Sequence, residues 1–446
     1  MSMLKVYPAA GPLRGCARVP GDKSISHRTL LLGALAEGET HAEGWLPAED
    51  CLATIRVLWA LGVEVTQQSP TSVRVQGVGL HGLREPADVL DCGGSGTTMR
   101  LLAGILAGQP FTSVLTGNPA LRRRPMGRIG TPLRAMGATI LSREMDGREK
   151  APLTIRGGQL RAIDYELPVA SAQVKSATLL AGLYAVGETG VHEPGPARDH
   201  TERLLTAMGA TLQREGRRIT VQPPQAPLRP LHSPAGGPYQ IPADISSAAF
   251  LLVAASLVHG SAVTLPATGV NETRTGLLDI LKAMGADITI ANLRGEEIEP
   301  VADLTVHGTE LEAAEIGGEV VVRAIDEFPI LAVAATQAAG RTIVRDAGEL
   351  RVKESDRIAA VAAELRKMGV AIDEAPDGFS VAGPARLRGA EVDSHMDHRL
   401  AMALAVAGLV ADGPTTIHNA EVIDDSFPGF GQLMRALGAE IAWTGE

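Results

Sequence analysis

Aromatic residues are scarce in this chain of 446 residues, which has 6 Phe, 4 Tyr and 3 Trp. Proteins that bind single-stranded nucleic acid stack bases on aromatic rings, so such a binding surface is not expected here. The formal net charge of −10 also argues against a general nucleic-acid binder, although a local cluster of Lys and Arg can still bind a small anion. Because 45% of the residues are hydrophobic, the chain is globular. Because so few of them are aromatic, its core must be aliphatic.

Cysteine is also rare, and Cys16, Cys51 and Cys92 form no C-x-x-C pair. Neither a disulfide framework nor a zinc ribbon is indicated. The first residues contain no signal-peptide-like run, and the longest apolar runs, such as residues 401–411, are about half of what spans a bilayer. We therefore expect a reduced, cytoplasmic, monomeric protein with neither a membrane nor a nucleic acid as partner.

One short phrase recurs six times along the chain. Each copy has an apolar helix end, a glycine and then alternating strand residues, as in LRAMGATI from Leu133. We interpret each glycine as the left-handed end of a helix, a conformation that residues with a Cβ adopt only at a cost. These glycines are 69 to 84 residues apart: Gly62, Gly137, Gly209, Gly285, Gly369 and Gly438.

A second phrase also occurs once per period. It has a polar or glycine-rich start, an apolar helix rich in Ala and Leu, a glycine turn and a strand. A helix that is apolar on most sides is buried, so each repeat is predicted to hold one buried helix and one amphipathic helix between strands. The buried helices are expected to begin near Ser24, Gly94, Ser171, Ser246, Asp326 and Asp397. A Pro- and Gly-rich stretch, residues 222–242, divides the chain into two halves of three repeats.

The start of the first buried helix, residues 21–28 (GDKSISHR), combines capping residues with two cations, Lys23 and Arg28. A helix N-terminus offers free N–H groups and the positive end of the helix dipole, so this segment suits an anion. An ordinary capped surface helix remains an alternative. A Walker A loop is excluded because the residue immediately before Lys23 is not glycine and the upstream spacing does not match.

Two further stretches in the first half suit anions. Residues 91–100 (DCGGSGTTMR) contain glycines that let backbone N–H groups approach a ligand, although a plain tight turn explains them as well. Residues 121–127 (LRRRPMG) hold three adjacent arginines, which also fit a solvated basic loop. Pro125 stiffens that loop and can hold Arg124 in place for carboxylate or phosphate capture.

The remaining starts carry other polar groups. Residues 171–175 (SAQVK) place a hydroxyl and an amide at a helix start, and Asp326 opens another helix as a dipole partner or a base. In residues 353–357 (KESDR), Glu354 and Arg357 are three apart and would share a helix face, as an exposed ion pair in the simplest interpretation.

The last start, residues 395–399 (HMDHR), has two histidines, which raises metal binding as a minor alternative. If the repeats are arranged alike, the same end of each buried helix points the same way. The cations at these ends would then converge on one cleft that suits a substrate with phosphate and carboxylate groups: Lys23, Arg28, Arg124, Lys353, Arg357 and Arg399. Two acids, Asp326 and Glu354, would remain for proton transfer.

At these residues the chain closely resembles the 5-enolpyruvylshikimate-3-phosphate (EPSP) synthase family. The resemblance covers nearly the whole length, and its segments occur in the family's order: PGDKSISHR, SGTTMR, RRRPMG, SAQVKS, RVKESDR and MDHRLAM. It implies an α/β protein with the enolpyruvyl transferase fold, an inside-out α/β barrel of two similar domains. Each domain would contain three βαβαββ units about a pseudo-threefold axis. The domains would be residues 21–241, and residues 1–20 with 242–446, and would close on substrate.

The resemblance also implies a reaction: transfer of the enolpyruvyl group of phosphoenolpyruvate to the 5-hydroxyl of shikimate-3-phosphate, with release of phosphate and without a cofactor or metal. Asp326 would accept the hydroxyl proton and Glu354 would protonate the methylene carbon, with Lys23 also catalytic. Shikimate-3-phosphate would be held by Lys23, Ser24, Arg28, Ser171, Ala172, Gln173, Asp326 and Lys353. Phosphoenolpyruvate would be held by Lys23, Gly96, Arg124, Gln173, Arg357 and Arg399.

Three positions depart from the common pattern of the family. Gly94 stands where many members carry Asn, and Asp425 lies near where some carry a phosphoenolpyruvate-binding lysine, a role that Lys353 can partly cover. The SAQ triplet and Arg198 resemble a second subgroup, in which Arg198 would approach shikimate-3-phosphate.

Two rival functions remain. UDP-N-acetylglucosamine enolpyruvyl transferases have a similar fold, but they typically carry a reactive Cys on a loop corresponding to residues 116–127, where this chain has none. A non-catalytic repeat scaffold that binds anions would not need Asp326 or Glu354.

Overall fold

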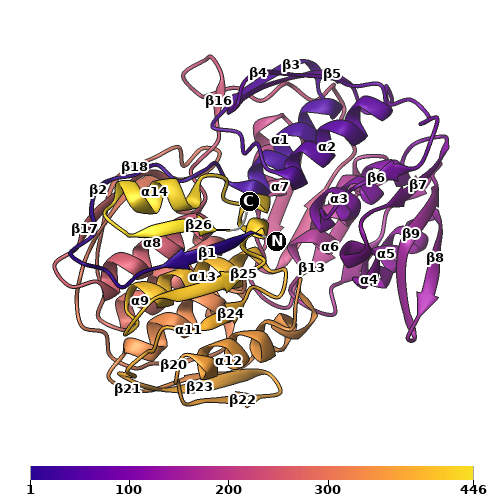
Figure 1. Cartoon of the computed structure of the whole chain (residues 1–446). Coiled ribbons are helices and arrows are strands. Elements are labelled where there is room, and N and C mark those ends of the chain that lie inside the picture. Colours follow the sequence, from indigo (N-terminus) through magenta and orange to yellow (C-terminus); the bar gives the residue numbers. More distant parts are fainter. Residues whose placement is uncertain (1, 445–446) are drawn as a thin grey trace. The chain divides into compact units, whose positions relative to one another are not determined.

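The computed structural model describes residues 2–444, so residues 1, 445 and 446 of the predicted second domain lie outside the described part. The chain folds into two compact units (Figure 1). The first unit comprises residues 21–241 together with 297–299. The second unit comprises residues 2–20, 242–296 and 300–444. No helix among residues 2–444 combines the length and apolar character needed to cross a membrane.

The first unit contains seven helices and fourteen strands among its described residues. Its helices are α1 (Lys23–Leu35), α2 (Glu49–Ala60), α3 (Gly96–Ala107), α4 (Pro119–Arg123), α5 (Gly127–Met136), α6 (Ala172–Gly182) and α7 (His200–Ala207). Its strands are β3 (Glu37–Glu43), β4 (Glu64–Ser69), β5 (Ser72–Val78), β6 (Leu90–Asp91), β7 (Thr112–Thr116), β8 (Thr139–Met145), β9 (Arg148–Arg156), β10 (Leu160–Arg161), β11 (Asp164–Glu166), β12 (Ala185–Val186), β13 (Thr189–His192), β14 (Leu212–Glu215), β15 (Arg218–Val221) and β16 (Tyr239–Gln240).

The second unit has the same kinds of elements. Its α-helices are α8 (Ile245–Leu257), α9 (Gly276–Ala283), α10 (Glu319–Arg323), α11 (Phe328–Gln337), α12 (Arg357–Lys367), α13 (His398–Leu409) and α14 (Phe430–Ala436). Three 3-10 helices are η1 (Glu272–Arg274), η2 (Gly348–Val352) and η3 (Ala420–Asp425). Its strands are β1 (Met3–Val6), β2 (Arg14–Cys16), β17 (Ala262–Gly269), β18 (Asp287–Arg294), β19 (Val301–His307), β20 (Glu315–Ile316), β21 (Gly340–Val344), β22 (Ile372–Ala375), β23 (Gly378–Gly383), β24 (Glu391–Asp393), β25 (Thr415–His418) and β26 (Ile441–Thr444).

Six four-stranded sheets share one topology, three in each unit. In each sheet one edge strand is parallel to its neighbour, and the other two pairings are antiparallel. In the order β6-β7-β9-β8, for example, β6 is the parallel edge strand. In four of the sheets the parallel pair flanks one buried helix in sequence, because a parallel connection needs a crossover. In the other two sheets the parallel partners, β16 with β3 and β2 with β17, are far apart in sequence. The predicted α/β class with βαβαββ repeats is therefore confirmed.

The last strand before each passage of the chain between the two units still belongs to the unit that the chain leaves. β2 precedes α1 in sequence but pairs with β17 of the second unit. β16 precedes α8 but pairs with β3 of the first unit. The N-terminal strand β1 lies between β25 and β26, and Figure 1 shows indigo β1 beside yellow β26.

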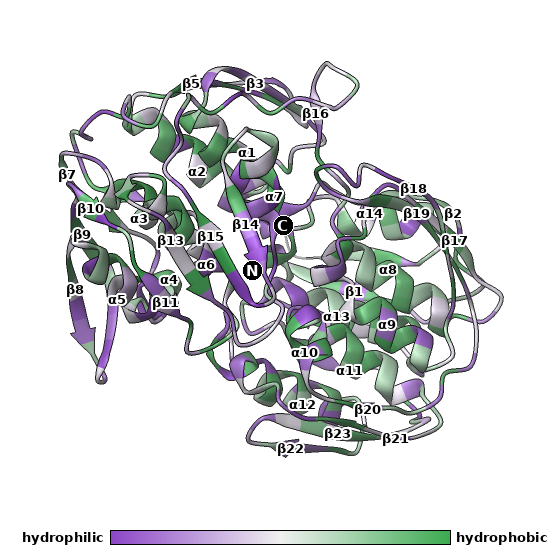
Figure 2. Ribbon diagram, turned by 180° about the vertical axis from the view of Figure 1, so that it is seen from behind, coloured by the Kyte–Doolittle hydropathy of each residue, from purple (hydrophilic) through white to green (hydrophobic). Residues whose placement is uncertain are grey.

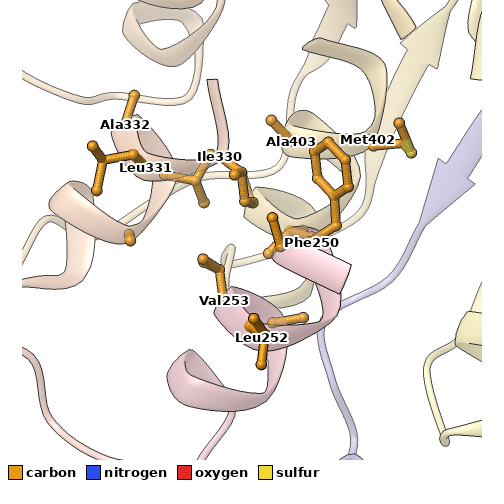
Figure 3. Packing of buried hydrophobic residues seen from close by; sticks show 14 of the residues in the cluster. Phe250, Leu252, Val253, Ile330, Leu331, Ala332, Met402 and Ala403 are labelled. Atoms are coloured by element: carbon orange, nitrogen blue, oxygen red, sulfur yellow. The ribbon is translucent and has the colours of Figure 1, made fainter. Parts of the chain in front are cut away.

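The buried helices form the centre of each unit. In the second unit α8, α11 and α13 contact one another, and their apolar side chains interlock around Phe250, Ile330 and Met402 (Figure 3). The ribbons of these three helices are coloured mostly as hydrophobic in Figure 2. In the first unit α3 contacts both α1 and α6. The expectation of one buried helix per repeat is confirmed, since α1, α3, α6, α8, α11 and α13 are buried along most of their lengths.

The repeated glycines lie at the ends predicted for them. All six follow a helix and have φ between 83° and 111°, the left-handed region that favours glycine. Each buried helix begins within two residues of its predicted start. The fifth, α11, begins at Phe328, so Asp326 precedes the helix. Glu354 is likewise not helical, because α12 begins at Arg357 with Asp356 as its N-cap.

Candidate active site

Three buried helices of the first unit begin at predicted site residues. α1 begins at Lys23, α3 at Gly96 and α6 at Ala172. Each start is capped by a side-chain oxygen of the preceding residue: Asp22 accepts from Ile25 N, Ser95 from Thr98 N and Ser171 from Val174 N. The remaining N–H groups at these ends, with the positive ends of the helix dipoles, favour an anion.

Lys23 at the start of α1 is paired with an acid of α2. Its Nζ lies 3.2 Å from Oδ2 of Asp50, and both side chains are about four-fifths enclosed. Asp50 had no role in the sequence interpretation. Because the partner of Lys23 is a carboxylate, an anionic ligand has to compete with that carboxylate for the ammonium.

Arg28 lies one turn further along α1 and is 3% exposed. Its guanidinium donates to Oγ1 of Thr201 at 2.8 Å, to Oγ of Ser176 at 3.0 Å and to the carbonyl oxygen of Ser24 at 3.1 Å. These partners are neutral oxygens. Burial lowers the pKa of Arg28 to about 10, against the opposing charge of Glu202, so the side chain remains cationic at neutral pH.

A buried histidine connects the helices behind these starts. Nδ1 of His27 lies 2.8 Å from Oγ1 of Thr54 in α2, and Thr54 lies 2.7 Å from Oγ1 of Thr98 in α3. Burial lowers the pKa of His27 from 6.5 to about 3, so the ring is neutral at neutral pH. The histidine therefore contributes a neutral hydrogen-bond link between three helices.

Gly96, Arg100 and Arg124 lie together at the start of α3. A Cβ placed on Gly96 would lie 2.8 Å from Nη1 of Arg100 and 3.0 Å from Nη1 of Arg124. The absence of a side chain at position 96 thus leaves room for two guanidinium groups. Of the three adjacent arginines, Arg122 and Arg123 are exposed, whereas Arg124 is half-buried.

The sequence interpretation missed Arg100 as a site residue, although the SGTTMR segment contains it. Its guanidinium donates to Oε1 of Gln173 at 2.6 Å and to the carbonyl oxygen of Pro125 at 3.2 Å. The amide of Gln173 in turn donates to Oγ1 of Thr97 at 3.0 Å. Arg100 therefore orients Gln173 and connects α3, α6 and the segment of residues 121–127 that carries the three arginines.

The other predicted residues of the first unit are accessible in part. Ser24, Ser171, Ala172 and Arg198 are all half-buried. At the departure from the family pattern, a Cβ on Gly94 would lie 3.3 Å from Nδ2 of Asn118, so a neighbouring amide borders that position.

In the second unit three predicted cations surround the carboxylate of Asp326. Its Oδ1 lies 3.2 Å from Nζ of Lys353 and 3.3 Å from Nη1 of Arg357. Its Oδ2 lies 3.7 Å from Nη2 of Arg399. The structure therefore brings the predicted acid and the three predicted cations of this unit into one cluster, from the starts of α11, α12 and α13.

Arg357 is the centre of a wider ion network. Nη2 lies 2.8 Å from Oε2 of Glu354, and Nε lies 2.8 Å from Oδ2 of Asp397. The simple expectation of an exposed pair between Glu354 and Arg357 is wrong, because Arg357 is 2% exposed and only the carboxylate is partly accessible. Although burial disfavours both charges, their mutual attraction raises the pKa of Arg357 and lowers that of Asp397.

Two further acids of this cluster were missed. Asp397 caps α13 by accepting from the backbone N of Arg399 at 3.0 Å. Glu327, which is 2% exposed, lies 3.6 Å from Nη1 of Arg399 and accepts a hydrogen bond from Ser246. No sequence pattern identified either as a partner, because each is joined to Arg357 or Arg399 only by the fold.

The two histidines of residues 395–399 have different surroundings. His395 is exposed, and its Nε2 lies 2.8 Å from Oε1 of Glu364, whereas His398 is buried. Within residues 2–444 no group of three or more His, Cys, Asp or Glu side chains is arranged to hold a metal ion. Asp425 is exposed at the end of η3.

The site residues of the first unit and the cluster around Asp326 in the second unit suit different parts of a reaction. The first unit offers helix N-termini, cations and the Gln173 amide, which suit phosphate and carboxylate oxygens. The second offers three cations around Asp326, with Glu354 partly exposed, which suits anion binding and proton transfer.

The sequence and the fold both resemble known proteins. Residues 8–434 match the family EPSP synthase (3-phosphoshikimate 1-carboxyvinyltransferase). A 3-phosphoshikimate 1-carboxyvinyltransferase of Pelotomaculum thermopropionicum is 55% identical over 426 residues, covering 95% of this chain and 96% of the relative. One of Desulforudis audaxviator is 53% identical over 439 residues, covering 98% and 100%. The structure of EPSP synthase from Acinetobacter baumannii covers 100% of both chains at 45% identity with a TM-score of 0.88. The chain therefore belongs to the EPSP synthase family.

Proposed function

We propose that this protein transfers the enolpyruvyl group of phosphoenolpyruvate to the 5-hydroxyl of shikimate-3-phosphate and releases inorganic phosphate. Family membership at about 50% identity over nearly the whole length supports this activity. One observation at the level of residues carries this proposal: Asp326 lies within 3.7 Å of three cations. These cations can bind a substrate that has both a carboxylate and a phosphate group.

The reaction is an addition followed by an elimination. The 5-hydroxyl oxygen attacks C2 of phosphoenolpyruvate while C3 takes up a proton, which gives a tetrahedral adduct. Loss of a proton from C3 and of phosphate from C2 restores the double bond in the product. In this proposal Asp326 accepts the hydroxyl proton and Glu354 exchanges the proton at C3.

The cations stabilise the charges of both substrates. Shikimate-3-phosphate is bound by Lys23, Ser24, Arg28, Ser171, Ala172, Gln173, Arg198, Asp326 and Lys353. Phosphoenolpyruvate is bound by Lys23, Gly96, Arg124, Gln173, Arg357 and Arg399. Cations that already surround the leaving phosphate need no rearrangement as its charge develops, which lowers the barrier to elimination.

We also propose that the working form is a cytoplasmic monomer with two domains, residues 21–241, and residues 1–20 with 242–446. Light scattering coupled to gel filtration measures the mass of the particle in solution against the chain mass of 46.5 kDa. A mass of about twice that value would contradict the monomer.

A phosphate-release assay tests the activity. We expect release only when phosphoenolpyruvate and shikimate-3-phosphate are both present, and none when UDP-N-acetylglucosamine replaces shikimate-3-phosphate. Release with the UDP-sugar would support the rival transferase. Glu354→Gln should lower turnover at least 100-fold while both substrates still bind, whereas a scaffold without catalysis would release no phosphate in any arm.

A further inference from the structure

Lys175 is a fully buried cation that the proposed mechanism does not use. It lies in α6, where every neighbouring position from Val174 to Gly182 is buried. An ammonium has three N–H donors, and three oxygens surround this one. They are Oε2 of Glu193 at 2.8 Å, Oε1 of Glu202 at 2.7 Å and the carbonyl oxygen of Ala197 at 3.0 Å.

The charge of this group is secured by its partners. Burial alone would lower the pKa of Lys175, but Glu202 and Glu193 outweigh it and raise that pKa above its usual value. Replacing a buried ion cluster by apolar residues is often neutral or stabilising, so stability by itself does not explain a lysine in an apolar helix. The positions of its partners suggest another reason.

Each helix that Lys175 joins also contributes a hydroxyl to Arg28. Ser176 follows Lys175 in α6, and Thr201 precedes Glu202 in α7. The two hydroxyls lie 2.7 Å apart, and both accept from the guanidinium of Arg28. The ion pair between Lys175 and Glu202 therefore fixes the two helices at the point where they hold Arg28.

The third contact of Lys175 reaches the loop before α7. The ammonium donates to the carbonyl oxygen of Ala197, the residue next to Arg198. Glu193, at the other end of the same loop, is also bound to the ammonium. One buried side chain thus holds the loop that carries Arg198 and the helices that orient Arg28.

We infer that Lys175, with Glu202, is a positioning residue for shikimate-3-phosphate, acting through Arg28 and Arg198. This inference rests on the proposed function, in which those two arginines bind that substrate. Lys175 touches no substrate in this account. Its loss should weaken the binding of shikimate-3-phosphate and leave the binding of phosphoenolpyruvate unchanged. Gly96 lies in α3 and Arg124 in residues 121–127, and the Gln173 amide is held by Arg100 and Thr97 of α3 rather than by Lys175.

The test compares Glu202→Gln and Lys175→Met with Arg214→Met in the full-length chain. Arg214 is the matched control because it pairs with the other oxygen of Glu193 and donates to the carbonyl oxygen of Gly216, and neither partner binds Arg28 or carries Arg198. We expect Glu202→Gln and Lys175→Met to raise the KM and the calorimetric Kd for shikimate-3-phosphate about tenfold. The KM for phosphoenolpyruvate should change less than about twofold, and Arg214→Met should change neither constant.

Glu202→Gln alone carries the test if Lys175→Met does not fold, because the amide keeps the shape of the side chain and leaves Lys175 paired with Glu193. An unchanged KM for shikimate-3-phosphate in folded Glu202→Gln would overturn the inference, as would an equal rise for both substrates. These outcomes are distinct from failure of the proposed function, in which the wild-type protein itself would form no product.

Discussion

Nε of Arg357 lies 2.8 Å from Oδ2 of Asp397, and the other oxygen of the same carboxylate accepts from the backbone N of Arg399. One buried carboxylate thus fixes two of the cations proposed to bind phosphoenolpyruvate. It holds the side chain of Arg357 directly and positions Arg399 by capping its helix.

Replacing Asp397 by Asn should be costly for stability. The variant leaves the buried guanidinium of Arg357 with less compensating charge, and we expect a loss of about 3 kcal/mol in the free energy of unfolding. Urea denaturation measures it. The matched control is Asp373→Asn, whose pair with Arg341 is exposed and should contribute less than about 1 kcal/mol. Equal losses in the two variants would contradict the assigned role of Asp397.

The buried neutral His27 should make stability depend on pH. Its pKa is about 3 in the folded state and 6.5 when unfolded, so the unfolded chain binds the additional proton between these values. The stability that His27 contributes is therefore present above pH 6.5 and falls as the pH drops toward 3, by at most about 1.4 kcal/mol per pH unit. His27→Gln should show a shallower decline in unfolding free energy over this range. Parallel pH profiles for the two proteins would show that His27 is not the responsible group.

Asp326→Asn should separate catalysis from binding. The amide keeps the size of the side chain but cannot accept the hydroxyl proton, so kcat should fall at least 100-fold. Calorimetry should still detect shikimate-3-phosphate, since Lys353 and the contacts of the first unit remain. Turnover close to that of the wild type would remove Asp326 from the mechanism.

Gly96→Ala should weaken the binding of phosphoenolpyruvate but not that of shikimate-3-phosphate. The added methyl group would lie 2.8 Å from Nη1 of Arg100 and 3.0 Å from Nη1 of Arg124, so we expect the guanidinium groups at this site to shift. The KM for phosphoenolpyruvate should rise about tenfold with little change for shikimate-3-phosphate. Gly158→Ala is the control, because a Cβ there meets no atom within 4 Å and should leave both constants unchanged. A rise confined to shikimate-3-phosphate would contradict the assignment of Gly96.

The fold class could be predicted because its signals are local and repeated. The six helix-ending glycines, such as Gly137 with φ of 111°, lie where the backbone is left-handed and glycine is favoured. The apolar helices show which elements are buried. Helix starts were less well defined. Asp326 was predicted to open its helix as a dipole partner or a base, yet it lies two residues before α11 and is paired with cations.

Site residues were predicted only where they belong to a recognisable sequence motif. The roles of these residues in binding and catalysis remain predictions. Arg100, Asp397 and Glu327 were missed because their partners lie far away in sequence: Arg100 meets Gln173 and Asp397 meets Arg357. Lys175 did carry a signal, a lone cation in an apolar helix. Its partners Glu193 and Glu202 become apparent only when α6 and α7 are folded together.

The central claim is that the cations and acids of this chain act together on one pair of phosphorylated substrates. Phosphorus NMR of the wild-type protein with shikimate-3-phosphate and phosphoenolpyruvate tests it most directly. We expect the signals of both substrates to disappear at equal rates while inorganic phosphate and one new phosphomonoester appear in equal amounts. Phosphate formed from phosphoenolpyruvate alone, or two unchanged substrate signals, would contradict it.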